Sequence, residues 1–304
     1  MKSSNLVVGL SSLIVVLALL AVGAGFLWPN TGAPFAFTTL RGQEVQIYGH
    51  GLYRYDTLFT GAANRGNDIV TLVVAIPLLV YATLRYWRGS LRGGLLLLGT
   101  LVYFLYVYGS YALGIAFNSA FLVYIALFSV SLYTFVLLFV SIDRQLLADH
   151  LAPDLPRRGI AIFMFVSGLV TLMIWLQPLL NDLIQNQMPA LVGIYSTKIT
   201  DVLDLGIITP ATLIAGTLIM RRNPLGYLVA FSLLVLEIML TPMIIAQTVS
   251  QWLAGIAFTT GQIVGPMIGF ATLGLFALWV TVILLRNTAD TVPSPTPPLQ
   301  AVHA

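Results

Sequence analysis

Eight apolar stretches, most of them a little over twenty residues long, limit the possible folds of this chain more than any other feature. A helix needs about 20 apolar residues to cross the hydrocarbon core of a bilayer, where its backbone must satisfy its own hydrogen bonds. The sequence therefore predicts an all-α polytopic bundle of eight transmembrane helices. We expect them at approximately 5–28, 68–87, 94–117, 119–141, 159–180, 200–220, 225–248 and 263–285.

Composition agrees with this prediction and removes several classes of function. Apolar residues make up 58% of the 304 positions and charged residues 8%, against about 45–50% and 25% in soluble domains. Because the chain has no cysteine and only three scattered histidines, we predict neither a metal site nor a cofactor. The formal charge of +3 is too small for a nucleic-acid surface. The expected partner is the lipid bilayer.

The basic residues predict the orientation of the bundle, because Lys and Arg gather in cytoplasmic loops. Eight crossings divide these residues into two sets on opposite sides of the membrane. The smaller set, on the outer side, is Arg41, Arg54, Arg65 and Lys198. The larger set is Lys2, Arg85, Arg88, Arg92, Arg144, Arg157, Arg158, Arg221, Arg222 and Arg286. Both termini are therefore expected in the cytoplasm of a bacterial cell, with the protein in its cytoplasmic membrane.

The first apolar stretch also resembles a signal peptide, with a basic start and small residues at 21–25. Its apolar run of about 24 residues exceeds the usual 7–15 of a signal core, so we expect a retained helix.

The segments between the helices predict little additional structure. The bundle at 1–286 includes an outer loop at 29–67, in which alternation at 35–39 and 44–48 predicts a short hairpin. Gly-rich loops are expected at 49–56 and 61–68, and a short interfacial helix within 143–158. The proline-rich tail at 287–304 is expected to be disordered. We find no convincing internal repeat, although four helices plus four is the natural division.

Glu237 is the charged side chain in the middle of a long apolar helix. An ionisable group near the bilayer centre is costly and is a default candidate for function. No Arg or Lys is expected at its depth, and burial without a cation favours the neutral acid. We therefore predict a proton-carrying acid, or alternatively a structural one hydrogen-bonded to Thr241 or a tyrosine.

The start of the sixth helix gathers three charges at a spacing of three residues. Lys198, Asp201 and Asp204 share one helix face. Asp201 or Thr200 is a good N-cap, and an acid in the first turn meets the positive end of the helix dipole. Asp204 lies about one turn deeper, where capping explains less. The spacing of the two acids also resembles the metal-diphosphate motif of membrane prenyltransferases, here in a single copy.

The third helix carries tyrosines well away from the interface, where an aromatic belt is expected. A buried tyrosine usually needs a hydroxyl partner, so these rings either bond neighbouring helices or line a solute pocket. Asp68, at the predicted start of the second helix, would line an outer vestibule together with Asp204, with Arg54 or Arg65 as counter-charge. Alternatively, these residues face bulk water as separate caps. The residues proposed here for the pocket are Tyr103, Tyr106, Tyr111, Asn118, Asp68, Arg54 and Arg65.

Several segments resemble those of a group of bacterial membrane proteins without assigned function. They are Gly51-Leu-Tyr-Arg-Tyr-Asp-Thr57 and the residues at 88–93, 117–129, 204–208 and 221–227. The resemblance spans most of the chain and implies a polytopic membrane protein, with no activity to carry over.

The favoured functional hypothesis is a small-solute transporter or permeation protein, because a midplane acid, buried tyrosines and proline-broken helices occur together. Two alternatives remain open. One is a membrane sensor or accessory subunit. The other is a membrane enzyme that uses Asp201, Asp204 and either His50 or Asp68.

Overall fold

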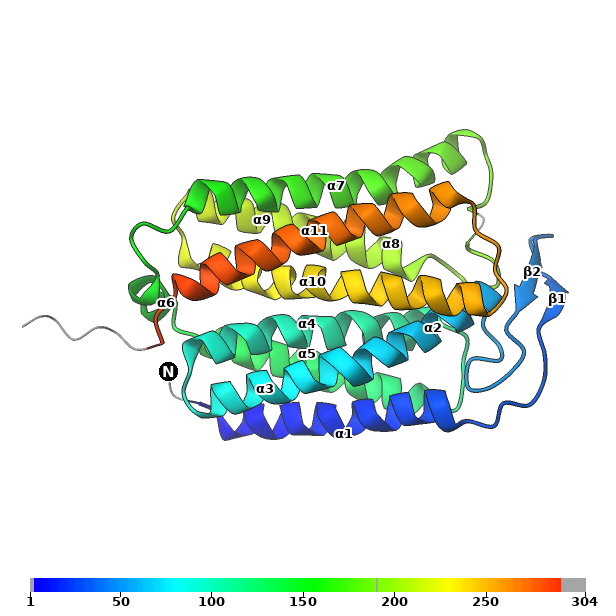
Figure 1. The fold of residues 1–304 in the computed structure, drawn as a ribbon, viewed down its shortest axis with the longest axis horizontal. Helices are drawn as coiled ribbons and strands as arrows, with labels where there is room; N and C mark the ends of the chain where they lie inside the picture. Colours follow the sequence, from blue (N-terminus) through cyan, green and yellow to red (C-terminus); the bar gives the residue numbers. More distant parts are fainter. Residues whose placement is uncertain (1–2, 190, 291–304) are drawn as a thin grey trace, which may run out of the picture.

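The computed structural model describes residues 3–189 and 191–290. Figure 1 shows long helices lying side by side along the longest axis, with a small two-stranded sheet beyond one end. We call that end the hairpin end, and the opposite end, where the first helix begins and the last one finishes, the tail end. The helices are α1 (Asn5–Leu27), α2 (Leu58–Val70), α3 (Ile76–Trp87), α4 (Leu91–Gly114), α5 (Phe121–Ser141), α6 (Arg144–His150), α7 (Arg157–Ile184), α8 (Ile199–Leu203), α9 (Thr209–Met220), α10 (Pro224–Leu253) and α11 (Thr260–Arg286).

Within the described residues, eight helical spans are long and apolar enough to cross a membrane, which confirms the predicted bundle. Two of the spans are composite. One joins α2 to α3 through a five-residue π-helix, η1 (Thr71–Ala75), and the other joins α8 to α9 through η2 (Asp204–Ile208). In each case a proline, Pro77 or Pro210, follows the π-helix. Because proline lacks an amide N–H, each break leaves a carbonyl of the preceding turn without its helical donor.

The predicted hairpin is confirmed, with strand β1 (Phe35–Thr38) antiparallel to β2 (Glu44–Ile47). The short helix predicted within 143–158 is also confirmed, as α6, which Asp143 caps by accepting the N–H groups of Gln145 and Leu146. The Gly-rich segment at 61–68 was predicted to be a loop, and that prediction is wrong, because it forms most of α2. Gly61 and Gly66 serve there for close packing, since a Cβ on Gly66 would lie 2.5 Å from the backbone of Ala246 in α10.

The chain contains an internal repeat that inspection of the sequence did not detect. Every element boundary from the start of η1 to the start of α4 has an equivalent 133 residues later, between the start of η2 and the start of α10. Thr71, for example, corresponds to Asp204. The turns correspond as well, since Gly89 and Arg222 both have positive φ and the residues after them, Ser90 and Asn223, are both N-caps. The described residues therefore form two halves, each with four membrane-length spans in the same order.

The two halves meet along α4 and α10, which contact each other at the centre of the bundle. In Figure 1 the first four crossings lie in the lower part of the view and the last four in the upper part. Gly99 permits the close approach, because a Cβ there would lie 2.4 Å from the Cβ of Val235. Most of α4 is buried, so its polar side chains face protein and not lipid.

Candidate functional site

The tyrosines of α4 reach both broken helices. The Tyr103 hydroxyl lies 2.9 Å from the Thr71 hydroxyl at the start of η1. One turn further along, the Tyr106 hydroxyl donates to Asp204 Oδ2 at 3.3 Å, at the start of η2. Thr71 and Asp204 are equivalent positions in the two halves, so a single helix holds both breaks. We call these four residues, with Asp68 and its partner Tyr53, the tyrosine–carboxylate cluster.

Asp68 is a fully buried carboxylate in α2. The Tyr53 hydroxyl, from the loop before α2, lies 2.9 Å from its Oδ2 and 3.1 Å from its Oδ1. On the other side the carboxylate lies against Gly25 of α1, where a Cβ would collide with it. Arg65, which lies in α2 with Asp68, donates to the Gly25 carbonyl oxygen. Protein atoms from three segments therefore replace the water around this acid.

Asp201 is the counterpart of Asp68 in the second half, since each lies nine residues before the proline of its break. It forms an ion pair with Lys198 at 2.6 Å, as the shared helix face predicted. The Lys198 ammonium lies 5.8 Å from the centroid of the Trp175 ring in α7. The expected capping by Thr200 or Asp201 is wrong, because α8 begins one residue after Lys198 with no side-chain cap. Asp201 is therefore paired with a cation, whereas Asp68 is paired with a tyrosine.

A third polar contact joins the halves through α2 and α10. Gln247 Nε2 donates to Asn67 Oδ1 at 2.7 Å, and Gln251 Nε2 donates to the Phe59 carbonyl at 3.1 Å. Asn64, one turn before Asp68, is 4% exposed, and its Nδ2 has no hydrogen-bond partner among the described residues. Buried amides rarely remain unpaired, so this donor is available to a ligand or an ordered water.

The remaining predicted pocket residues have local partners. The Tyr111 hydroxyl donates to the Asn64 carbonyl at 3.3 Å, close to the Asp68 pocket. Asn118 Oδ1 accepts the Ala120 N–H at 2.9 Å in the turn before α5. The guanidinium of Arg54 lies over the Tyr55 ring instead of facing Asp68. The structure thus brings Tyr103 and Tyr111 near Asp68 and Tyr106 to Asp204, while Arg54 lies over Tyr55.

Glu237 lies near the middle of α10 and is partly buried. Its Oε1 accepts a hydrogen bond from the Ser167 hydroxyl of α7 at 2.7 Å. The expected partner, Thr241, instead donates to the Phe270 carbonyl of α11. Among the described residues, the ion pairs are Arg85–Asp290 and Lys198–Asp201, so no cation is paired with Glu237.

Asp56 ties three segments together at the hairpin end. Its Oδ1 accepts the Ala116 N–H at 2.8 Å and the Tyr195 hydroxyl at 2.9 Å. The Tyr195 hydroxyl also accepts the Thr57 N–H at 3.2 Å, and Thr57 is the N-cap of α2. Burial raises the pKa of Asp56 to about 7, although the hydrogen bonds from Ala116 and Tyr195 act to lower it. We call this arrangement the Asp56 clasp.

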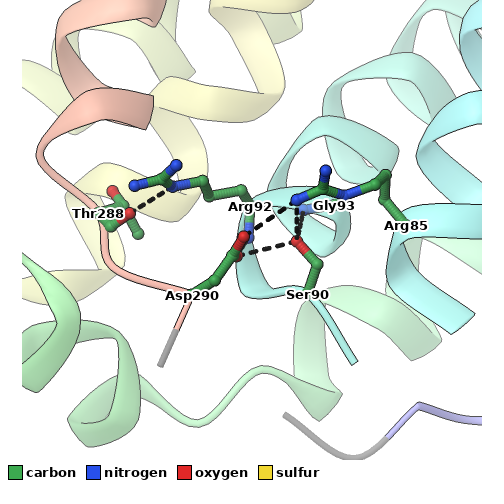
Figure 2. Close-up of polar contacts among 6 residues, drawn as sticks. All are labelled: Arg85, Ser90, Arg92, Gly93, Thr288 and Asp290. Carbon is green, nitrogen blue, oxygen red and sulfur yellow. Dashed lines mark hydrogen bonds and ion pairs between the residues drawn. The ribbon is translucent and has the colours of Figure 1, made fainter. Parts of the chain in front are cut away.

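Asp290 forms the corresponding contact at the tail end (Figure 2). Its Oδ1 accepts the Ser90 hydroxyl at 2.8 Å and the Arg92 N–H at 3.0 Å, while Oδ2 pairs with Arg85 at 3.0 Å. Partial burial acts to raise the pKa of Asp290, but the Arg92 and Ser90 hydrogen bonds and the two guanidiniums bring it below its ordinary value. The first residues of the expected tail, 287–290, are therefore fixed to the turn between α3 and α4. The remainder of that tail, 291–304, lies outside the described residues.

The described residues contain no group of three or more His, Asp or Glu side chains that could hold a metal ion. Asp201 and Asp204 belong to α8 and η2 of the second half, whereas Asp68 belongs to α2 of the first half. His50 lies against Tyr48, with the ring centroids 4.0 Å apart and the ring planes tilted by 31°. The carboxylates of the enzyme hypothesis are therefore distributed over two halves of the bundle.

Sequence reasoning missed Tyr53, Asp56, Ser167, Tyr195 and Asp290. Each contacts a residue far along the chain, as Ser167 contacts Glu237 seventy positions away. One signal was available for the repeat, since Asp68 and Asp201 each precede a proline by nine residues.

Searches of protein-family models, curated proteins and solved structures found no match to this chain. Within the part of the chain that the structure describes, eight membrane-length helical spans define the fold of a multi-pass integral membrane protein.

Proposed function

We propose that this protein is a transporter or permeation protein that moves a small solute across the cytoplasmic membrane of a bacterium. The hairpin end would face outward, because the smaller set of basic residues lies there and the larger set lies at the tail end. The observation that carries the proposal is the matched pair of broken helices, each with a buried carboxylate beside its π-helix.

Broken helices suit this role for a physical reason. Interrupted spans in transporters direct helix ends and free carbonyls at the solute, close to an interface between repeats. Single-turn π segments likewise occur often at functional sites. Here both breaks contact α4, which lies at the interface of the two halves, through Tyr103 and Tyr106. The tyrosine–carboxylate cluster supplies hydroxyl donors and carboxylate acceptors for a polar solute.

Intramembrane acids further support transport over a purely anchoring role. Tyr53 and Gly25 enclose Asp68. Within the described part of the chain, Glu237 accepts a side-chain hydrogen bond from Ser167. Such residues commonly mark ion or proton pathways. We infer that Asp68 and Asp204 bind the solute or its coupling ion, and that Glu237 exchanges a proton during the cycle.

Proteoliposomes loaded with a pH-sensitive dye test this proposal. Single solutes from a fixed panel of amino acids, short organic acids, sugars and nucleosides are added outside, and uptake and internal pH are recorded. We expect at least one solute to accumulate, with Asp68→Asn and Asp204→Asn each lowering the rate at least tenfold. Glu237→Gln should abolish coupled proton movement while leaving solute binding intact.

The matched control is Asp154→Asn, an exposed acid outside the spans, which should transport normally. A panel in which nothing enters above empty liposomes would contradict the proposal. So would uptake that is equal in the wild type and both cluster variants.

A further inference from the structure

The hairpin at the end of the bundle has one apolar and one polar face. Its register pairs Phe35 with Ile47 and Phe37 with Val45, and residues two apart in a strand point the same way. These four residues therefore share a face, while Glu44 belongs to the opposite one. A two-stranded hairpin is marginally stable alone, so its apolar face needs a covering surface.

The covering is incomplete. The apolar face lines a groove of about 650 Å³, whose other wall is the segment 193–196 together with Tyr55. Phe35 and Phe37 remain 52% and 46% exposed, although the groove already has a second wall. Ligand pockets in proteins typically measure about 300–1,000 Å³ and are mostly apolar with a few placed polar groups. The hairpin groove meets that description.

Two guanidiniums near the hairpin groove indicate that its ligand is an anion. Arg41 lines the groove, and its Nη1 donates to the Tyr195 carbonyl at 2.9 Å. A guanidinium has five N–H donors in a fork that suits carboxylates, so most of this fork is still available. Arg54 lies 5.3 Å from the centroid of Tyr55, another lining residue. Among the residues that the structure describes, no acidic residue lines the groove, and Glu44 is on the far face of the hairpin.

We propose that the hairpin groove binds a small water-soluble organic anion with an apolar body, such as an aryl or medium-chain alkyl carboxylate. The apolar body covers Phe35 and Phe37, and the anion meets Arg41. The sheet lies beyond the ends of the helices and not along their sides, so the groove is reached from water (Figure 1). This site is separate from the tyrosine–carboxylate cluster, and either can fail without the other.

Occupancy of the groove is transmitted to α2 through Tyr195. Tyr195 lines the groove and its carbonyl accepts from Arg41, while its hydroxyl donates to Asp56 and accepts the N–H of the N-cap residue Thr57. A ligand that fixes Tyr195 therefore fixes the start of the helix that carries Asp68. The groove is in this way a regulatory or initial binding site for the bundle.

Calorimetry on the full chain in phosphatidylcholine nanodiscs tests the proposal, with 4-phenylbutyrate and decanoate as probes. We expect saturable binding of at least one probe, and about tenfold weaker binding of the neutral 4-phenylbutanamide, because a charge-assisted hydrogen bond is lost. Arg41→Gln should weaken binding of the anion about tenfold, and Arg41→Lys much less. Phe37→Ser, which alters an exposed ring outside the bundle, should also weaken it.

The control is Arg144→Gln at the tail end, which removes an exposed cation without touching the groove. Absence of binding for both probes, or equal binding of the acid and the amide, would overturn the proposal. Competition by phosphatidylglycerol in the nanodisc, with no binding of either probe once that lipid is present at low levels, would assign the groove to lipid and overturn it as well. Loss of binding in Arg144→Gln equal to that in Arg41→Gln would exclude a local effect.

Discussion

The Asp56 clasp should make the stability of the hairpin end depend on pH. A buried acid whose folded pKa is raised to about 7 from 3.8 is neutral in the folded protein over a range where the unfolded chain is ionised. Its contribution is therefore fully present below pH 3.8 and is lost as pH rises through about 7. At about 1.4 kcal/mol for each pH unit, the whole interval corresponds to about 4 kcal/mol.

Thermal unfolding in neutral-lipid nanodiscs measures this effect. The melting temperature of the wild type should fall by several degrees between pH 5 and pH 8, since a few kcal/mol shifts the midpoint of a large domain by about 2 °C for each kcal/mol. Asp56→Asn cannot ionise but still accepts the N–H of Ala116, so its curve should lose most of this slope. Asp154→Asn should keep the wild-type slope. The reasoning is refuted by a slope that is the same in wild type and Asp56→Asn, or by a wild type that becomes more stable as pH rises to 8.

Two further predictions concern packing and the tail-end contact. Gly66→Ala should lower the free energy of unfolding by about 1–3 kcal/mol because the added Cβ meets the α10 backbone. Gly9→Ala, where nothing lies within 4 Å of the added Cβ, should be neutral or stabilising in the same thermal assay. Equal effects of the two substitutions would contradict the close approach. Asp290→Asn should speed hydrogen exchange at the Arg92 N–H about tenfold, because a charge-assisted hydrogen bond is lost. Asp149 is an exposed acid in α6, so Asp149→Asn should leave exchange at that amide unchanged. Protection retained in Asp290→Asn would show that the acid does not hold this segment.

The eight spans and the hairpin could be predicted from one sequence because hydropathy and alternation are local signals. The start of α2 could not. Its first ten residues, 58–67, are polar and Gly-rich, a composition that indicates a loop when lipid is assumed to surround it. In the structure, α10 packs against this stretch of α2, so Asn64 and Asn67 face protein.

The sequence indicated which residue types would form the candidate site, but not which side chains would contact one another. Glu237 and Asp204 stood out as acids in apolar segments, since each is costly to bury, whereas the sequence indicated Asp68 only as an acid at the outer start of the second helix. Their partners Ser167, Tyr106 and Tyr53 depend on which helices pack together, and that depends on contacts spread over the whole chain. The repeat was hidden for a related reason, because it is conserved in backbone breaks and turns while the side chains differ.

An even number of crossings in each half means that both halves enter the membrane in the same direction. They are then related by an axis along the membrane normal, as in parallel repeats, and act as a covalently joined pair of four-helix units. Departures from symmetry are therefore informative. Phe104 of α4 corresponds to Glu237, and Thr71 corresponds to Asp204, so at both positions the acid belongs to the second unit. Asp68 and Asp201 are an equivalent pair as well, so a proton pathway through these two units would meet one acid in the first unit and three, with Asp204 and Glu237, in the second.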